Sequence, residues 1–133
     1  MSASISSINY CPVKSISFQT VSNCKIRKNI GIVGDRVFAF SKGLEFNQAQ
    51  LFEKNLDERR GKWNKILTLK NSPVLNKYNF KLKDNELTFT QKNNEILTID
   101  VSKTSEHKLL SNKILELESS LQEPMFLMKN KDI

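Results

Sequence analysis

Three polar side chains near the start of the sequence have the chemistry of an anion site. Lys14 and Ser15 follow Pro12-Val13, and Arg36 follows Gly34-Asp35 further along the chain. An ammonium group, a hydroxyl and a planar guanidinium can hold a phosphate together, the guanidinium through two parallel hydrogen bonds. Both motifs are typical of turns next to strands, where binding residues concentrate. The same turn and Asp-Arg pair also occur for purely structural reasons, so both interpretations stand at this point.

The composition indicates one globular domain, residues 1–133, with a modest core. Of the 133 residues, 38% are hydrophobic, and the net charge is +7. Such a charge permits contact with nucleic acid, anionic cofactors or acidic partners. The cations are mostly lysines scattered among uncharged residues, without an arginine stripe or alternation with aromatic residues, which argues against a nucleic-acid role.

Other classes of protein are disfavoured by what the sequence lacks. No apolar stretch approaches the roughly 20 residues needed to span a bilayer, and residues 1–7 lack the features of a secretory signal. The sequence therefore predicts a cytoplasmic protein without a membrane segment. Cys11, Cys24 and His107 cannot supply four ligands at metal spacing, so no metal site is expected. The two thiols are expected to be reduced and at least partly buried, and no catalytic residue is assigned.

The first half of the chain predicts short strands followed by a helix. Strands are expected at residues 4–10, 16–21, 24–28 and 36–41, the last with both faces covered. Asn47 as N-cap and Gln50 as its return partner predict a helix from 47 to 60 that stops at Gly61.

The second half predicts a meander and a terminal helix. Strands are expected at 65–69, 75–82, 86–91 and 95–101, with turns at 84–85 and 92–94. A helix at 105–121 carries the apolar stripe Leu110, Ile114, Leu117 and Leu121. The apolar tail 125–128 is expected to need a partner. The fold class is therefore mainly β (α+β): a small β-barrel or a curved antiparallel or mixed sheet, with an inserted helix and a C-terminal helix.

Three blocks of sequence carry a resemblance to a known family. They are Tyr10-Cys11-Pro12-Val13-Lys14-Ser15, Gly31-Ile32-Val33-Gly34-Asp35-Arg36, and the segment 67–75, Leu-Thr-Leu-Lys-Asn-Ser-Pro-Val-Leu. In this order they resemble the N-terminal β-barrel domain of MOSC (molybdenum cofactor sulfurase C-terminal) proteins, over roughly residues 5–101.

The resemblance implies a cofactor and a partner domain. In that family the barrel domain packs on the MOSC domain, and a molybdenum-pterin cofactor lies between them. Lys14, Ser15 and Arg36 match positions that contact the cofactor, including its phosphate end, and Lys70 stands where many relatives have Arg. The resemblance thus implies an accessory half that lines the cofactor or substrate cleft of an oxidoreductase or sulfurtransferase-like system.

The chain also departs from the family pattern. Cys11 stands where many relatives have an aromatic residue, and the helix at 47–60 is inserted into a usually short hairpin. The MOSC domain, with its molybdenum-ligating cysteine, is missing, so residues 104–133 are expected to lead toward it and the chain alone is expected not to be catalytic.

Two alternatives to this function come from other classes. One is a free-standing protein-interaction domain that uses its basic surface and the tail at 125–128. The other is binding of RNA or DNA on the sheet, which would need aromatic and lysine side chains on one exposed face.

Overall fold

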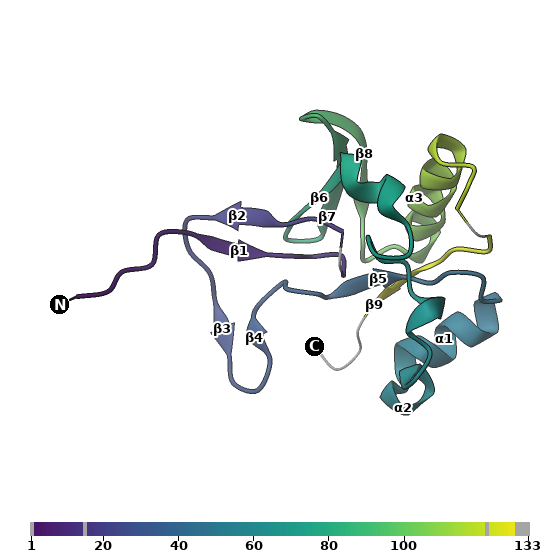
Figure 1. Cartoon of the computed structure of the whole chain (residues 1–133), viewed down its shortest axis with the longest axis horizontal. Coiled ribbons are helices and arrows are strands. Elements are labelled where there is room, and N and C mark those ends of the chain that lie inside the picture. Colours follow the sequence, from purple (N-terminus) through teal and green to yellow (C-terminus); the bar gives the residue numbers. More distant parts are fainter. Residues whose placement is uncertain (1, 15, 122, 130–133) are drawn as a thin grey trace.

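The computed structural model describes residues 2–14, 16–121 and 123–129 (Figure 1). The strands are β1 (Ile8–Tyr10), β2 (Gln19–Val21), β3 (Ile26–Arg27), β4 (Gly31–Ile32), β5 (Phe38–Phe40), β6 (Tyr78–Lys83), β7 (Glu86–Gln91), β8 (Asn94–Asp100) and β9 (Leu127–Lys129). The α-helices are α1 (Phe46–Lys54), α2 (Leu56–Arg59) and α3 (Thr104–Leu117), and the 3₁₀ helices are η1 (Trp63–Lys65) and η2 (Pro73–Lys77).

The described residues form an α+β fold in which strands dominate, as the sequence predicts. Their strands fall into four small sheets, β1–β2, β3–β4, β5–β9 and β6–β7–β8. Because the strands are divided in this way, the predicted barrel does not close within the described part of the chain.

The β6–β7–β8 meander contains the longest strands, and all its pairs are antiparallel. Its two turns place Asp84, Lys92 and Asn93 in the left-handed region, with φ of 54°, 51° and 66°. Turns of this kind match the right-handed twist of paired strands. The predicted strand 86–91 coincides with β7, and the predicted turn at 84–85 is confirmed. The turn predicted at 92–94 covers only 92–93, because Asn94 begins β8.

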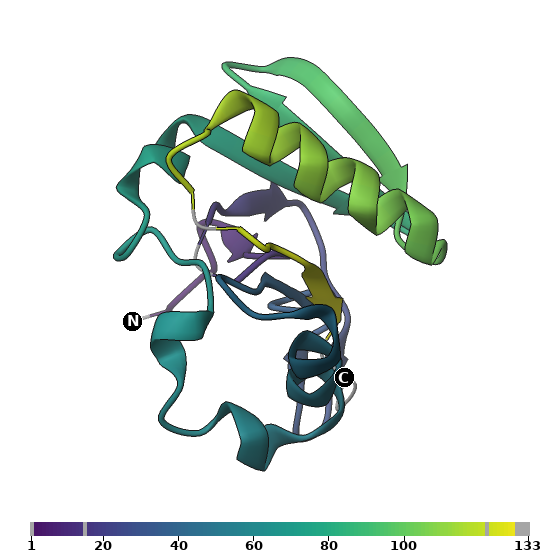
Figure 2. The same ribbon diagram turned by 90° about the vertical axis from the view of Figure 1, so that its right-hand side faces the viewer.

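The core lies between this sheet and α3. Alternation along the strands buries Phe80 and Phe89, whose rings stack with centroids 5.1 Å apart. α3 lies along β8 and also contacts β9, and it buries Leu110 and Ile114 (Figure 2). The predicted stripe is only partly right, because the helix ends at Leu117, whose side chain is 42% exposed.

The C-terminal tail packs on the domain's own core. Met125, Leu127 and Met128 are buried, and β9 pairs antiparallel with β5. The tail therefore packs on this chain's own core up to Lys129 and needs no separate partner for its apolar side chains. That residues 104–133 lead toward a MOSC domain stays a prediction. Residues 130–133 lie outside the described residues. Main-chain pairing with β5 satisfies the tail's polar groups, and the core covers its apolar side chains.

Two predictions between β5 and β6 are also wrong. The expected helix 47–60 is interrupted at Asn55, whose backbone is extended and whose Oδ1 accepts a hydrogen bond from the amide of Asp57 at 2.9 Å. Asn55 thus ends α1 and caps α2, whereas the N-cap of α1 is Glu45, not Asn47. The expected strand 65–69 is replaced by the end of η1, an isolated bridge from Ile66 to Ser41, and a turn.

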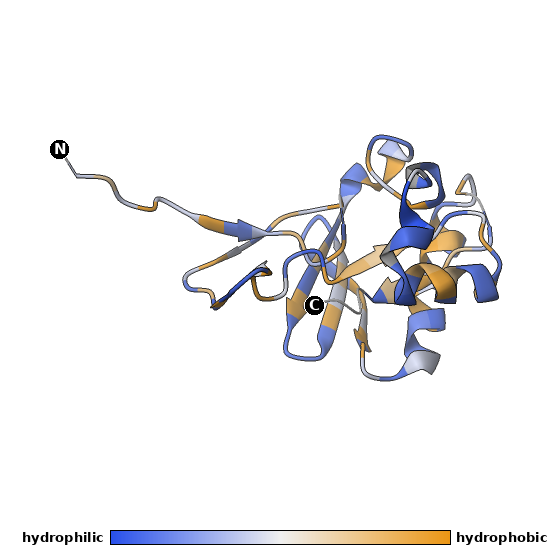
Figure 3. Cartoon of the chain, turned by 90° about the horizontal axis from the view of Figure 1, so that it is seen from below, coloured by the Kyte–Doolittle hydropathy of each residue, from blue (hydrophilic) through white to orange (hydrophobic). Residues whose placement is uncertain are grey.

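The hairpins β1–β2 and β3–β4 form what we call the N-terminal arm. The arm extends away from α3, at the opposite end of the molecule (Figure 1), and Figure 3 shows apolar residues along it as well as in the body. Strands β1, β2 and β3 are shorter than the predicted strands 4–10, 16–21 and 24–28, and β4 was not predicted. The arm joins the body at the turn after β1, where Pro12, Val13 and Ile16 are buried.

Candidate functional site

Main-chain hydrogen bonds bring together the two sequence motifs that carry Lys14 and Arg36. The amide of Arg36 donates to the carbonyl of Cys11 at 2.6 Å, and the amide of Phe38 donates to that of Pro12 at 3.0 Å. The amide of Lys14 donates in turn to the carbonyl of Phe38 at 2.7 Å. The segment after β1 therefore runs parallel to the start of β5, and it places Lys14 and Arg36 on adjoining chain segments.

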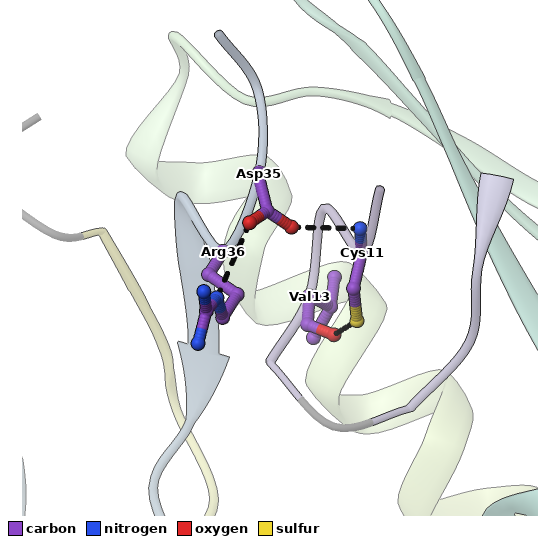
Figure 4. A network of polar contacts seen from close by, with 4 residues as sticks. All are labelled: Cys11, Val13, Asp35 and Arg36. Atoms are coloured by element: carbon purple, nitrogen blue, oxygen red, sulfur yellow. Dashed lines mark hydrogen bonds and ion pairs between the residues drawn. The ribbon is translucent and has the colours of Figure 1, made fainter. Parts of the chain in front are cut away.

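Asp35 fixes the turn that carries Arg36 (Figure 4). One of its carboxylate oxygens accepts a hydrogen bond from the amide of Cys11 at 2.9 Å, and the other lies 3.2 Å from Nε of Arg36. The Cys11 thiol, which is free and buried, donates to the carbonyl of Val13 at 2.7 Å. A single carboxylate thus ties the two motifs together and orients the guanidinium.

The backbone of this turn is unusual at two positions. Gly34 has a φ of 97°, and a Cβ there would lie 3.1 Å from a ring carbon of Tyr10, so the close approach requires glycine. Arg36 has a φ of 51°, a region that a long side chain enters at a cost of the order of 1 kcal/mol. Strained non-glycine residues of this kind gather at functional sites.

Three cations from three parts of the chain interact at this place. Burial of the half-buried Lys14 lowers its pKa, and the positive charges of Arg36 and Arg59 lower it further. Arg59 comes from the end of α2, far from both motifs in sequence. We call Lys14, Arg36 and Arg59 the cation cluster. Like charges held together repel one another, and an anion bound between them would relieve that repulsion.

A cleft of about 640 Å³ lies beside the cluster, between the arm and β6. Arg36 and Asp35 line it at one end, whereas Lys14 is not among its lining residues. Its other walls combine aromatic, aliphatic and amide side chains, and Phe18 is 77% exposed. The remaining lining residues are Asn9, Tyr10, Cys11, Ile16, Ser17, Phe18, Leu69, Asn76, Tyr78 and Asn79.

The cleft exists because side chains, not strands, join the arm to β6. The amide of Phe80 donates to Oγ of Ser17 at 2.9 Å. The Gln19 side-chain amide makes the two hydrogen bonds with Leu82 that the main chain of a neighbouring strand would make. It accepts from the Leu82 amide at 2.8 Å and donates to the Leu82 carbonyl at 3.2 Å. The Tyr10 hydroxyl donates to the same carbonyl, and burial raises the pKa of that hydroxyl. These contacts satisfy the β6 edge without closing a barrel.

A buried charged group supports the other side of the cleft. The Glu118 carboxylate, at the end of α3, lies 2.6 Å from both the Tyr78 hydroxyl and the Lys77 ammonium. Burial alone would raise the pKa of Glu118, but the hydrogen bonds from Lys77 and Tyr78, together with the Lys77 charge, hold it below its ordinary value. Burial and the hydrogen bond to Glu118 raise the pKa of Tyr78 to about 12.

The three predicted site residues, Lys14, Ser15 and Arg36, have different outcomes in the structure. Lys14 and Arg36 lie together, as the sequence suggests, although only Arg36 lines the cleft. Ser15 lies outside the described residues. The sequence does not single out Arg59, because no local pattern marks an arginine whose charge acts on a site from another element.

The described residues contain no cluster of metal ligands and no helix that could cross a membrane. No three His, Cys, Asp or Glu side chains lie together there as metal ligands. None of the helices in residues 2–14, 16–121 and 123–129 is long and apolar enough to cross a membrane.

Comparison with known proteins gives no match: no family model, no curated protein and no solved structure is similar to this chain.

Proposed function

We propose that this chain holds the phosphate end of a molybdenum-pterin cofactor at the cation cluster, as the accessory half of a MOSC system. The observation that carries the proposal is the main-chain pairing that places Lys14 beside Arg36, with Arg59 brought to them by α2. Phosphate bound by such groups gains charge-assisted hydrogen bonds, about twice as strong as neutral ones.

The residues present fit the anionic end of such a cofactor. Arg36 is 69% exposed and contacts Asp35 through Nε, so this contact does not use its two terminal nitrogens, which can donate to a phosphate. The adjoining cleft offers the amide groups of Asn9, Asn76 and Asn79 beside aromatic side chains, a lining suited to a flat ring with polar edges.

The proposal gives this chain a binding role and leaves catalysis to the MOSC domain. When bound, the cofactor would supply the redox or sulfur-transfer chemistry, and the residue that ligates molybdenum would come from that domain. Here, Arg36 and its neighbours would orient the cofactor from its phosphate end.

A binding experiment on the chain itself tests the proposal. Titration with a phosphorylated pterin, followed by amide chemical shifts, should give saturable changes around residues 11–14 and 34–38. Arg36→Ala should weaken binding by about tenfold, as expected for loss of one charge-assisted contact. Arg36→Lys should recover only part of it, because lysine lacks the planar fork.

Lys92→Ala is a matched control. Lys92 is exposed and has the same φ of 51° as Arg36, so both variants lose one positive charge from a left-handed backbone position. Binding should be unchanged in this control. Equal losses of affinity in Arg36→Ala and Lys92→Ala would show that binding depends only on net charge. Equal affinity for inorganic phosphate and for phosphorylated pterin would show that the site does not recognise the pterin.

A further inference from the structure

The β3–β4 hairpin has one apolar face and one basic face. Ile26 pairs with Ile32 and Arg27 with Gly31, and the amide of Val33 donates to the carbonyl of Lys25 at 2.8 Å. Because successive side chains of a strand point to opposite faces, Ile26 and Ile32 share one face. Lys25 and Arg27 lie on the other face, together with Val33, which is 41% exposed. Ile26 is 76% exposed. A side chain of this size gains free energy when it is covered.

The charge of this part of the chain is one-sided. Residues 1–34 contain four cations, Lys14, Lys25, Arg27 and Lys28, and no acidic residue. All 14 acidic residues lie at or after Asp35, so the rest of the molecule is close to balance. Lys25, Arg27 and Lys28 are all exposed on the hairpin. A surface of this kind attracts negatively charged partners and repels positively charged ones.

The position of the hairpin makes it accessible to a large partner. It lies at the end of the molecule opposite α3 (Figure 1), and Figure 3 shows the arm projecting beyond the body. The turn at Pro12 is hydrogen-bonded to Phe38 of β5. A partner could therefore cover the hairpin without exposing the core.

We propose that the β3–β4 hairpin inserts between the two walls of a groove in a partner protein, with Ile26 and Ile32 against an apolar wall and Lys25, Arg27 and Lys28 against an acidic wall opposite. This inference goes beyond the proposed cofactor site and does not depend on it.

Other occupants fit less well. A second copy would bring its own cations against these, and like charges oppose docking. Nucleic acid is favoured by aromatic side chains on which bases stack, and residues 22–34 contain none. A membrane would be entered by an exposed apolar tip, whereas Ile30 at the tip is half-buried and the exposed Ile26 lies on a side face.

A peptide of alternating glutamate and leucine is the probe for this proposal, because it presents an acidic row and an apolar row when extended. Fluorescence anisotropy should show binding by the full chain that weakens with salt, and much weaker binding of the same peptide with glutamine in place of glutamate. The charge reversal K25E/R27E/K28E should weaken binding by about tenfold or more, and Ile26→Ser by several-fold without a change of charge.

The triple variant K83E/K92E/K108E is the matched control, since it changes the net charge equally at exposed lysines outside the arm. Its affinity should stay within about twofold of the original chain, because none of its three charges lies on the hairpin. In each variant, amide chemical shifts away from the substituted positions and their immediate neighbours should remain unchanged, which verifies the fold.

Equal losses in the two triple variants would overturn the proposal, and so would undiminished binding by Ile26→Ser. It would also fail if oligouridine, or vesicles of equal parts phosphatidylcholine and phosphatidylserine, bound more tightly than the acidic peptide.

Discussion

The N-terminal arm and the body of this molecule are held together by different forces. The body is stabilised by packing, with Phe40, Phe80 and Phe89 almost fully buried between α3, β5 and the meander. The arm has strands of two or three residues and exposes Phe18 and Ile26, and polar side chains attach it to β6. Buried apolar area provides most of the stability of a fold, so the body forms the scaffold on which the arm is held.

The largest difference between the two regions should appear when one phenyl ring is removed from each. Phe80→Ala should lower the free energy of unfolding by about 3 to 5 kcal/mol, because a large cavity opens beneath the stacked ring of Phe89. Phe18→Ala, at a side chain that is 77% exposed, should change it by less than about 0.5 kcal/mol. Urea denaturation measures both, and similar losses would mean that the arm is part of the core.

The buried carboxylate of the body should have an intermediate effect. Glu118→Gln removes the ion pair with Lys77 and should cost about 1.5 to 3 kcal/mol. Glu116→Gln is the control, since that carboxylate is 71% exposed and pairs only loosely with Lys113, at 3.7 Å.

The pH dependence of stability gives a second test of the contacts among Glu118, Lys77 and Tyr78. A carboxyl whose pKa is lower in the folded state contributes stability above its ordinary value of 4.5, and the contribution is lost as the pH falls below it. The pKa of Tyr78 is raised from 10.0 to about 12, so its contribution is complete below pH 10 and is lost as the pH rises toward 12. Tyr78→Phe should therefore flatten the alkaline limb of the stability profile, and an unchanged limb would contradict the assignment.

The smallest expected effect on stability concerns the junction between the two regions. Gln19→Ala removes both hydrogen bonds to Leu82 and should cost about 1 to 2 kcal/mol. Hydrogen exchange of the Leu82 amide should accelerate more than that of amides within the β7–β8 pair. Gln48→Ala, at an exposed position of α1, should leave exchange at Leu82 unchanged. Unchanged exchange in Gln19→Ala would show that the arm is joined to β6 by other contacts.

Local patterns predicted the meander well because its information is local. The period-two alternation of residues 86–91 and the turn at Asp84-Asn85 specify strand, turn and buried face within a few residues. The same local reasoning went wrong at Asn55, where a side-chain cap divides the helix, and at Ile66, a buried residue that forms only one bridge with Ser41. At Asn55 the deciding contact is a cap to Asp57 that apolar spacing does not reveal, whereas at Ile66 it comes from Ser41, far away in sequence.

The candidate site likewise has a part that the sequence predicted and a part that it did not. Residue types alone singled out Lys14 and Arg36, because few side chains suit an anion. Arg59 could not be found in this way, since it reaches them only through the path of α2. The two motifs adjoin because the segment after β1 pairs in parallel with β5, and sequence spacing does not reveal such a pairing.

By itself, the sequence determined the mainly β class, the meander and the basic, acid-free N-terminal segment, because composition and short-range alternation encode these properties. The tertiary structure decided the rest. It turned the apolar tail back as β9, left the barrel open at the Gln19–Leu82 junction and assembled the cation cluster. Each of these depends on groups far apart in sequence that meet only when the core excludes water and every buried polar group must find a partner.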